Sequence, residues 1–317
     1  MNLKSSLAKS LCIAAMTFSM ATTANAAALR TFVSGFGSDG NTATNCSHAQ
    51  PCRTFAVAVT VTAPGGEIEA LDPAGYGPIT ISGPLTLVGL PGAAINAPSG
   101  GAGITINAGP NDAVHVQGLL IDGGGVGNEG IRFLSGKSLV IDNCVVRNLQ
   151  GSGIGLAPTT SATIAVSKTL VSDNGMHGIY LQPSGIVVVS ALFNQVEAYH
   201  SGQQGIGIFV NFMTSGSVMN AMIVDSVAGF NGNAGFYALR GLSIVNGNIN
   251  VSRSTTLANG SDGVMADGGI SLVVSQSNLQ DVWAQSSNSC VYSYGDNYTN
   301  SVSPPQPNGC GSVFATK

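Results

Sequence analysis

The sequence predicts an all-β protein that folds as a right-handed parallel β-helix with a short N-terminal capping helix. A glycine followed by an apolar residue recurs seven times, at intervals of 23 to 30 residues. Repeats of this length indicate stacked structural units. Apolar residues also alternate with other residues after each glycine, which is the period of a strand. Charged residues make up only 8% of the chain and glycine contributes 43 positions, which favours many short strands joined by tight turns.

The repeat aligns on its glycines. The positions one and three residues after each glycine are mostly aliphatic or aromatic, so we expect them to point inward and to stack on the equivalent residues of the next unit. The position between them is mixed and is expected to face water. A unit of about 25 residues then holds three short strands and three turns. The aligned glycines are Gly103, Gly130, Gly153, Gly178, Gly205, Gly235 and Gly263, and the first inward column is Ile104, Ile131, Ile154, Ile179, Ile206, Phe236 and Val264.

Asparagines recur at a nearly constant position in this repeat. Asn148, Asn174, Asn231 and Asn259 each precede a repeat glycine by four or five residues. Asparagine and glycine both tolerate turn and left-handed backbone conformations. The pattern therefore predicts a turn just before the most regular strand of each unit.

Residues 1–26 have the features of a secretory signal peptide. Lys4 and Lys9 precede a short apolar run over residues 11–20, and Ala24, Asn25 and Ala26 form a small-residue cleavage site. We therefore expect the protein to be secreted or periplasmic. The apolar run is too short to span a membrane, and no span is expected in the mature chain.

Three segments are expected after the signal peptide. Residues 27–66 would hold a first strand over 30–35, a disulfide loop, and a capping helix within 52–63 that is stopped by Pro64, although Val57, Val59 and Val61 there also fit a strand. Residues 67–285 would form the coils of the β-helix. Residues 286–317 would form a C-terminal tail that covers the exposed edge of the last coil.

The cysteines indicate disulfides, because an exported protein meets an oxidising compartment. On proximity alone we expect Cys46 to pair with Cys52 and Cys290 with Cys310, although four cysteines allow three pairings. Cys144, within the segment IDNCVV, is expected to be buried as a small apolar residue.

Two kinds of segment carry a resemblance to a known family. Residues 54–81 (TFAVAVTVTAPGGEIEALDPAGYGPITI) resemble the entry into the first coil of pectin-lyase-like β-helix proteins, and 141–156 (IDNCVVRNLQGSGIGL) and 171–181 (VSDNGMHGIYL) resemble their standard coils. The similarity spans about residues 30–285 and is greatest to exported bacterial right-handed β-helix repeat proteins of unassigned activity. The superfamily includes pectate lyases, polygalacturonases, pectin esterases, phage tailspikes and adhesins, so it implies a fold rather than a reaction.

The chemistry of those enzymes is not evident in the sequence. The resemblance implies acidic calcium ligands with a basic residue in a lyase, or paired carboxylates in a polygalacturonase. No cluster of this kind stands in the repeat, so neither a metal nor a cofactor is predicted. The formal net charge is −4 and no basic patch is present, which argues against a nucleic-acid partner. The sequence leaves the oligomeric state open.

One stripe of side chains is a candidate glycan site. Stacking would place His177, Tyr180, Gln204 and Tyr237 on one face of the middle coils. Tyrosine rings offer flat apolar surfaces with a polar tip, which suits sugar rings, and His177 titrates near neutral pH. The same residues also fit the ordinary solvated exterior of a solenoid.

Two functions follow from these observations. The first is a secreted or periplasmic β-helix protein of unassigned activity that is structural or binds a polysaccharide, a cell-envelope glycan or another envelope partner, without turning it over. The alternative is a carbohydrate-active enzyme, either a polysaccharide lyase or a glycoside hydrolase, with a divergent site on the middle coils.

Overall fold

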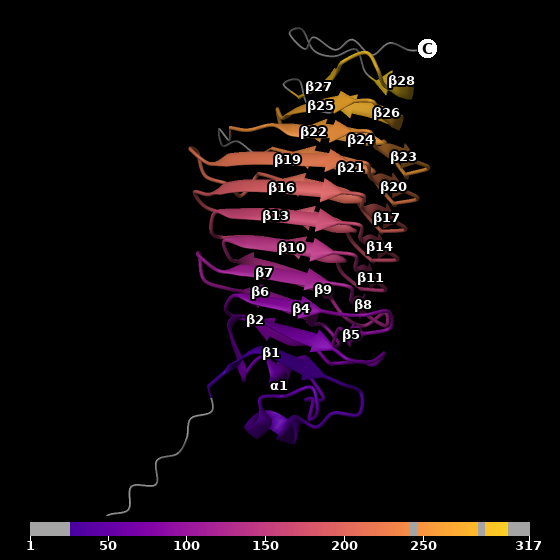
Figure 1. Cartoon of the computed structure of the whole chain (residues 1–317). Helices are drawn as coiled ribbons and strands as arrows, with labels where there is room; N and C mark the ends of the chain where they lie inside the picture. The colour runs from indigo at the N-terminus through magenta and orange to yellow at the C-terminus, as the bar shows by residue number, and fades with distance from the viewer. Residues whose placement is uncertain (1–25, 241–245, 285–288, 304–317) are drawn as a thin grey trace, which may run out of the picture.

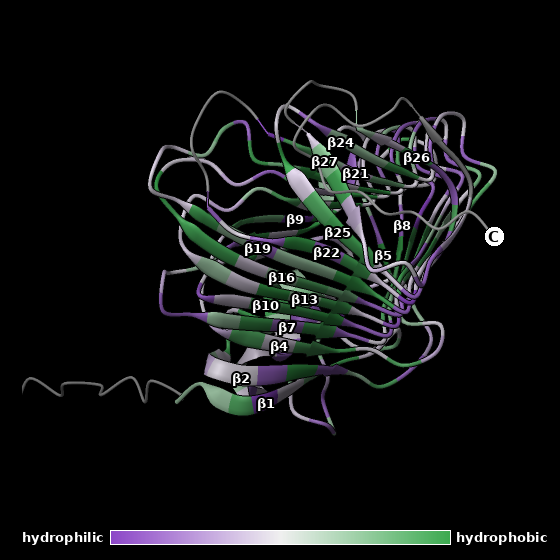
Figure 2. Ribbon diagram, turned by 90° about the horizontal axis from the view of Figure 1, so that it is seen from above, coloured by the Kyte–Doolittle hydropathy of each residue, from purple (hydrophilic) through white to green (hydrophobic). Residues whose placement is uncertain are grey.

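The computed structural model describes residues 26–240, 246–284 and 289–303, and shows a stack of parallel coils that rises from the N-terminus to the C-terminus (Figure 1). Each central coil contributes one strand to each of three faces, here named A, B and C, which form separate sides of the stack when it is seen from above (Figure 2). The all-β fold and the right-handed parallel β-helix predicted from the repeat are therefore confirmed.

Face A is an eleven-stranded parallel sheet. Its strands are β1 (Ala28–Val33), β2 (Thr62–Ala70), β4 (Leu85–Val88), β7 (Ala113–Gln117), β10 (Ser138–Asp142), β13 (Ala162–Ser167), β16 (Val188–Asn194), β19 (Val218–Val224), β22 (Ile249–Ser252), β25 (Ser271–Ser275) and β27 (Cys290–Ser293).

Faces B and C are connected through β26 (Asn278–Ala284), which pairs with the last strand of each and also with β28 (Tyr298–Ser303). Face B consists of β5 (Ala94–Asn96), β8 (Leu120–Asp122), β11 (Val145–Arg147), β14 (Leu170–Ser172), β17 (Glu197–Tyr199), β20 (Val227–Gly229) and β23 (Thr255–Leu257). Face C consists of β3 (Ile79–Ile81), β6 (Ala102–Asn107), β9 (Glu129–Ser135), β12 (Ile154–Leu156), β15 (Ile179–Leu181), β18 (Ile206–Phe209), β21 (Phe236–Leu239) and β24 (Val264–Asp267).

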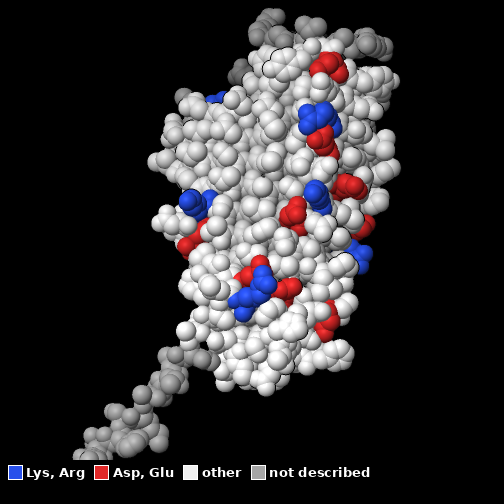
Figure 3. Space-filling model, viewed as in Figure 1, with Lys and Arg blue, Asp and Glu red and all other residues white. Residues whose placement is uncertain are grey.

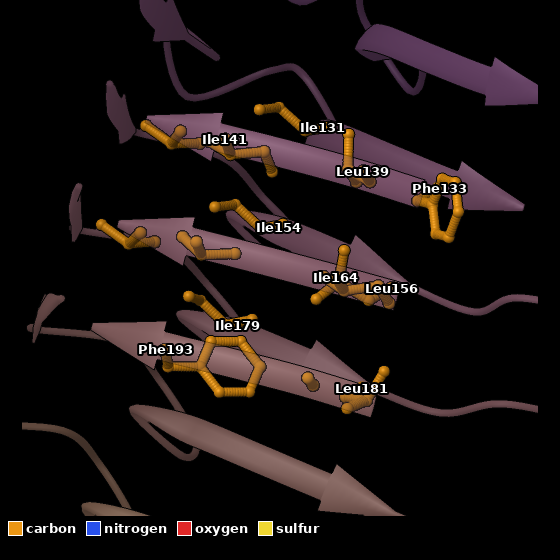
Figure 4. Close-up of a cluster of buried hydrophobic side chains, with 14 of the residues drawn as sticks. Ile131, Phe133, Leu139, Ile141, Ile154, Leu156, Ile164, Ile179, Leu181 and Phe193 are labelled. Carbon is orange, nitrogen blue, oxygen red and sulfur yellow. The ribbon is translucent and has the colours of Figure 1, made fainter. Parts of the chain in front are cut away.

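The predicted inward column lies in register along face C. Parallel pairing places Ile131 beside Ile154, Ile154 beside Ile179, and Ile179 beside Ile206. All four side chains are fully buried, and Figure 4 shows Ile131, Ile154 and Ile179 stacked from coil to coil. At about 25 cal/mol per Å² of buried apolar surface, such columns supply much of the free energy that holds the coils together.

The repeat glycines allow the coils to approach closely, and their backbone is not left-handed. None of the glycines from Gly130 to Gly263 in the aligned set has a positive φ. A Cβ atom at Gly178 would lie 2.6 Å from the carbonyl oxygen of Gly205, and one at Gly153 would lie 2.7 Å from that of Gly178. The glycines are therefore required by the distance between neighbouring coils rather than by turn geometry.

The predicted asparagine turn is displaced by one residue in most coils. Asn148 is left-handed, with a φ of 57°, but in later coils the left-handed residue is Asp173, Phe230 or another residue that precedes the asparagine. Asn231 is instead buried and donates from Nδ2 to the Ala198 carbonyl at 3.1 Å and to Asn259 Oδ1 at 3.0 Å. Asn174, Asn231 and Asn259 thus come directly after the turn in the sequence instead of forming it. Their buried side-chain amides link neighbouring coils.

The N-terminal end contains much less helix than the sequence predicts. Instead of a capping helix within 52–63, a single turn, α1 (Phe55–Ala58), lies at the N-terminal end of the stack, beside a 3₁₀ segment, η1 (Asp39–Thr44) (Figure 1). The predicted capping helix is therefore not confirmed. Thr54 caps the turn by accepting from the Val57 N–H, and the β-branched residues that follow lead into β2 at Thr62, consistent with their preference for extended backbone.

The cysteine predictions are confirmed where the structure tests them. Cys46 and Cys52 form a disulfide with a Cα–Cα distance of 4.9 Å. Cys144 is a buried free thiol, and burial raises its pKa to about 11, so it behaves as a core residue. Cys310, the expected partner of Cys290, lies outside the described residues, as does the predicted signal peptide up to residue 25.

Strand pairing continues beyond residue 285. β27 pairs with β25 on face A, and β28 pairs with β26. The remainder of the predicted tail, residues 304–317, lies outside the described residues. Among the residues that are described, no helix is both long enough and apolar enough to span a membrane.

Replacing a repeat glycine should test the close approach of the coils. We expect Gly178→Ala to lower the free energy of unfolding by about 1–3 kcal/mol, the usual cost of overpacking, because its Cβ meets the backbone of the next coil. Chemical denaturation measures the change. Gly83→Ala is the matched control, because a Cβ there meets no atom within 4 Å. Equal stability of the two variants would contradict the interpretation.

Candidate functional site

The outward positions of face C alternate between residues with large side chains and glycine. In register along five coils, the positions that follow the first inward residue are Arg132, Gly155, Tyr180, Gly207 and Tyr237. Neighbouring parallel strands are only about 4.8 Å apart, so bulky side chains in every coil would compete for the same space. The two glycines leave bare backbone over which rings from other positions lie.

Tyr180 covers the first bare position. A Cβ at Gly155 would lie 2.7 Å from Tyr180 Oη. The hydroxyl donates to Glu129 Oε1 at 2.7 Å, two coils away, and Arg132 Nε lies 3.3 Å from Glu129 Oε2. The Glu129 side chain is only 10% exposed. Burial, reinforced by Glu129, raises the pKa of Tyr180 well above its ordinary value, so the phenol stays protonated and its ring is held across the face.

A strip of rings continues from Tyr180 along the stack. Phe209 covers the second bare position, since a Cβ at Gly207 would lie 2.6 Å from its ring. The ring centroids of His177 and Tyr180 are 5.8 Å apart, those of His177 and Phe209 5.3 Å, and those of Phe209 and Tyr237 5.5 Å. We call these four side chains the aromatic strip. Burial raises the pKa of Tyr237 to about 12, and the nearby Asp267 carboxylate contributes to this shift.

A hollow of about 360 Å³ lies beside the aromatic strip. Its size is at the lower end of the range typical of small-molecule sites. It is bordered by the rings of His177, Tyr180 and Phe209 and by polar groups from three successive coils. The lining residues are Asn128, Glu129, Gly151, Ser152, Met176, His177, Tyr180, Gln182 and Phe209.

Two buried polar atoms lie near the hollow. Gln204 is 6% exposed, and neither its Oε1 atom nor His177 Nδ1 makes a hydrogen bond of ordinary geometry, although the two side chains are neighbours. Burial lowers the pKa of His177, an effect that the neighbouring Gln204 side chain partly opposes. The imidazole is therefore neutral at pH 7, with one ring nitrogen able to donate and the other able to accept. Buried polar atoms without partners are uncommon and are candidates for ligand contacts.

The structure places the four predicted residues along one line. His177 and Tyr180 line the hollow, Gln204 lies on the next coil, and Tyr237 joins through Phe209. Phe209 was not predicted, because it stands four residues after Gly205, outside the aligned window. The contact of Glu129 with Tyr180 was also missed, since the two residues are 51 positions apart.

One expectation for this face was wrong. Gly155, Gly207 and Met265 occupy the positions predicted to face water, but they are buried. The glycines are covered by Tyr180 and Phe209. Met265 is 8% exposed and pairs in register with Trp283 of β26. Part of the outer surface of face C is therefore buried beneath other side chains.

Acidic groups on this face do not gather into a metal site. In residues 26–240, 246–284 and 289–303, no group of three or more histidine, cysteine, aspartate or glutamate side chains could hold a metal ion. Asp262, near the last coils, has its pKa raised by burial and by the charge of Asp281. The side chains that line the hollow can form hydrogen bonds and stack against rings.

Comparison with known proteins shows the fold alone. No family model matches the sequence, and no curated protein matches it. Among solved structures, the chain is similar to pectate lyase Pel9A, with a TM-score of 0.61 and 15% identity over 88% of this chain and 78% of that one. It also matches the A-module of mannuronan C-5 epimerase AlgE4 from Azotobacter vinelandii, with a TM-score of 0.45 and 18% identity over 75% and 79% of the two chains. The chain therefore shares the parallel β-helix fold of pectate lyase Pel9A.

The buried imidazole makes stability depend on pH. Because the pKa of His177 is lower in the folded state, the unfolded chain binds its proton more readily, and stability falls as pH drops below about 6.5. We expect His177→Gln to reduce the loss of stability between pH 7 and pH 5, measured by denaturant titration. From pH 7.5 to 9 the two proteins should have parallel stability curves. An equal loss on acidification in both proteins would contradict the lowered pKa.

Proposed function

We propose that this chain is an exported β-helix protein that binds a glycan, of the cell envelope or of another polysaccharide, along the aromatic strip of face C. Export is supported by the signal-like sequence of residues 1–26 and by the Cys46–Cys52 disulfide, which suits an oxidising compartment. Because one fold hosts many activities, the glycan proposal depends on the surface and not on the likeness to pectate lyase.

The observation that carries the proposal is the aromatic strip beside a hollow. The rings of Tyr180 and Phe209 lie over the backbone of face C, and the Tyr237 ring packs against Phe209. Aromatic faces bury the apolar face of a sugar ring, and the polar groups that line the hollow can bind its hydroxyls. The strip runs across successive coils, so it suits an extended chain of sugars better than a compact ligand.

Removing rings from the strip should weaken binding. We expect Tyr180→Ala and Tyr237→Ala each to lower the affinity for the glycan roughly tenfold, equivalent to about 1.4 kcal/mol. A panel of polysaccharides, tested by affinity electrophoresis and then by calorimetry with the oligosaccharide that binds, gives the measurement. Tyr294→Ala is the matched control, because that tyrosine is 77% exposed and follows β27 of face A. Undiminished binding in both face C variants would rule out the strip as the site.

A second candidate function is favoured by His177. A neutral, largely buried imidazole with an unpartnered Nδ1 atom lies beside Tyr180, whose phenol remains protonated. A base next to an acid is the arrangement needed for proton transfer to and from a sugar ring. The alternative is therefore a carbohydrate-active enzyme, a polysaccharide lyase or a glycoside hydrolase, that acts in the same hollow.

Product formation separates the two functions. Binding without turnover predicts no new reducing ends and no unsaturated products from pectin, alginate and related polymers. If products appear, His177→Ala should reduce their rate by at least about 10²-fold, the typical contribution of a general acid or base. Binding of the polymer by the same variant is the control for folding. Turnover unchanged by His177→Ala would refute the role of His177.

A further inference from the structure

We infer that the glycan bound on face C is electrically neutral and that chains of uronate sugars are excluded. This inference rests on the proposed function, because it specifies the class of ligand for the same site. It is motivated by the way in which the protein already satisfies each charge around the hollow.

The cation beside the hollow is neutralised by the protein. Arg132 Nε lies 3.3 Å from Glu129 Oε2, and the Glu129 side chain is nine-tenths buried. The pair has no net charge. A uronate carboxylate would have to displace Glu129 from Arg132 or lose water without a cationic partner, and either step is unfavourable.

None of the other arginines in the described part of the chain lines the hollow. Each of them contacts a carboxylate or a backbone carbonyl, and opposite charges lie next to one another on the visible surface (Figure 3). Lys137 and Lys168 do not line the hollow. The engaged arginines are Arg30 with Glu67, Arg53 with the Gly75 carbonyl, Arg147 with Asp122, Arg240 with the Gly269 carbonyl, and Arg253 with Asp225.

Two carboxylates lie near the C-terminal end of the aromatic strip. Asp267 ends β24 and is close enough to Tyr237 to raise the pKa of that phenol. Asp262 precedes the same strand and has one carboxylate oxygen without a partner. An anionic polymer that followed the strip from Tyr180 past Tyr237 would therefore meet charges of its own sign, which disfavour its binding.

The groups that line the hollow suit hydroxyls. The His177 imidazole is neutral, and the Glu129 carboxylate can only accept hydrogen bonds. A sugar hydroxyl can donate to one such atom and accept from another, whereas a carboxylate only accepts. An acceptor such as Glu129 gains no hydrogen bond from a carboxylate, so the groups that suit a neutral sugar disfavour a uronate.

Affinity electrophoresis of the intact mature protein tests the inference. Gels would contain a xylan, a galactan or a glucomannan as neutral polymers, and polygalacturonate or alginate as anionic polymers, at low and high salt. We expect retardation by at least one neutral polymer, insensitive to salt, and none by the anionic ones. Retardation by an anionic polymer would overturn the inference while leaving glycan binding intact. Retardation by none of the polymers would overturn the proposed function as well.

Releasing the cation should change the preference. Glu129→Gln leaves Arg132 unpaired, so we expect it to gain retardation by polygalacturonate, with a roughly two- to fivefold increase in affinity that disappears in high salt. Gln182→Arg adds a cation to the lining without removing an anchor of Tyr180, and should act in the same direction. Glu67→Gln, which frees Arg30 on face A, is the matched control. If neither Gln182→Arg nor a folded Glu129→Gln gains affinity, the electrostatic exclusion is wrong.

Discussion

The close stacking of one coil on the next is the constraint on which the rest of the structure depends. Parallel strands about 4.8 Å apart place each residue directly beside its equivalent in the next coil. A position is therefore tolerated only if its side chain fits against its own counterpart. Aliphatic residues such as Ile131 and Ile154 meet this condition in the interior. The backbones at Gly153 and Gly178 approach so closely that no Cβ fits between them.

The same constraint shapes the outer surface of face C. Large side chains at every level would collide, so Tyr180 and Tyr237 stand two coils apart, roughly 10 Å, with Gly207 between them. Phe209, which lies four residues after the repeat glycine Gly205, fills the space that Gly207 leaves. A continuous row of rings thus arises from alternation between coils, and its spacing is set by the backbone rather than by the rings themselves.

The sequence predicted what depends on short-range periodicity. A period of two residues identifies the buried columns, because a strand exposes and buries alternate residues wherever it lies. The sequence could not distinguish an asparagine that forms a turn from one that follows the turn. Asn148 has a left-handed backbone, whereas Asn231 is buried and donates a hydrogen bond to Asn259. The sequence also could not pair Glu129 with Tyr180, because that contact depends on the register of two coils and on the empty position at Gly155.

Stacking also determines where charge is placed. Arg147 contacts Asp122, 25 residues earlier, and Arg253 contacts Asp225, 28 residues earlier, so each pair joins neighbouring coils. Ion pairs in the stack neutralise one another locally, and with 8% charged residues few charges remain to attract a ligand at a distance. Selection at such a surface must then come from ring geometry and from the polar groups that line the hollow.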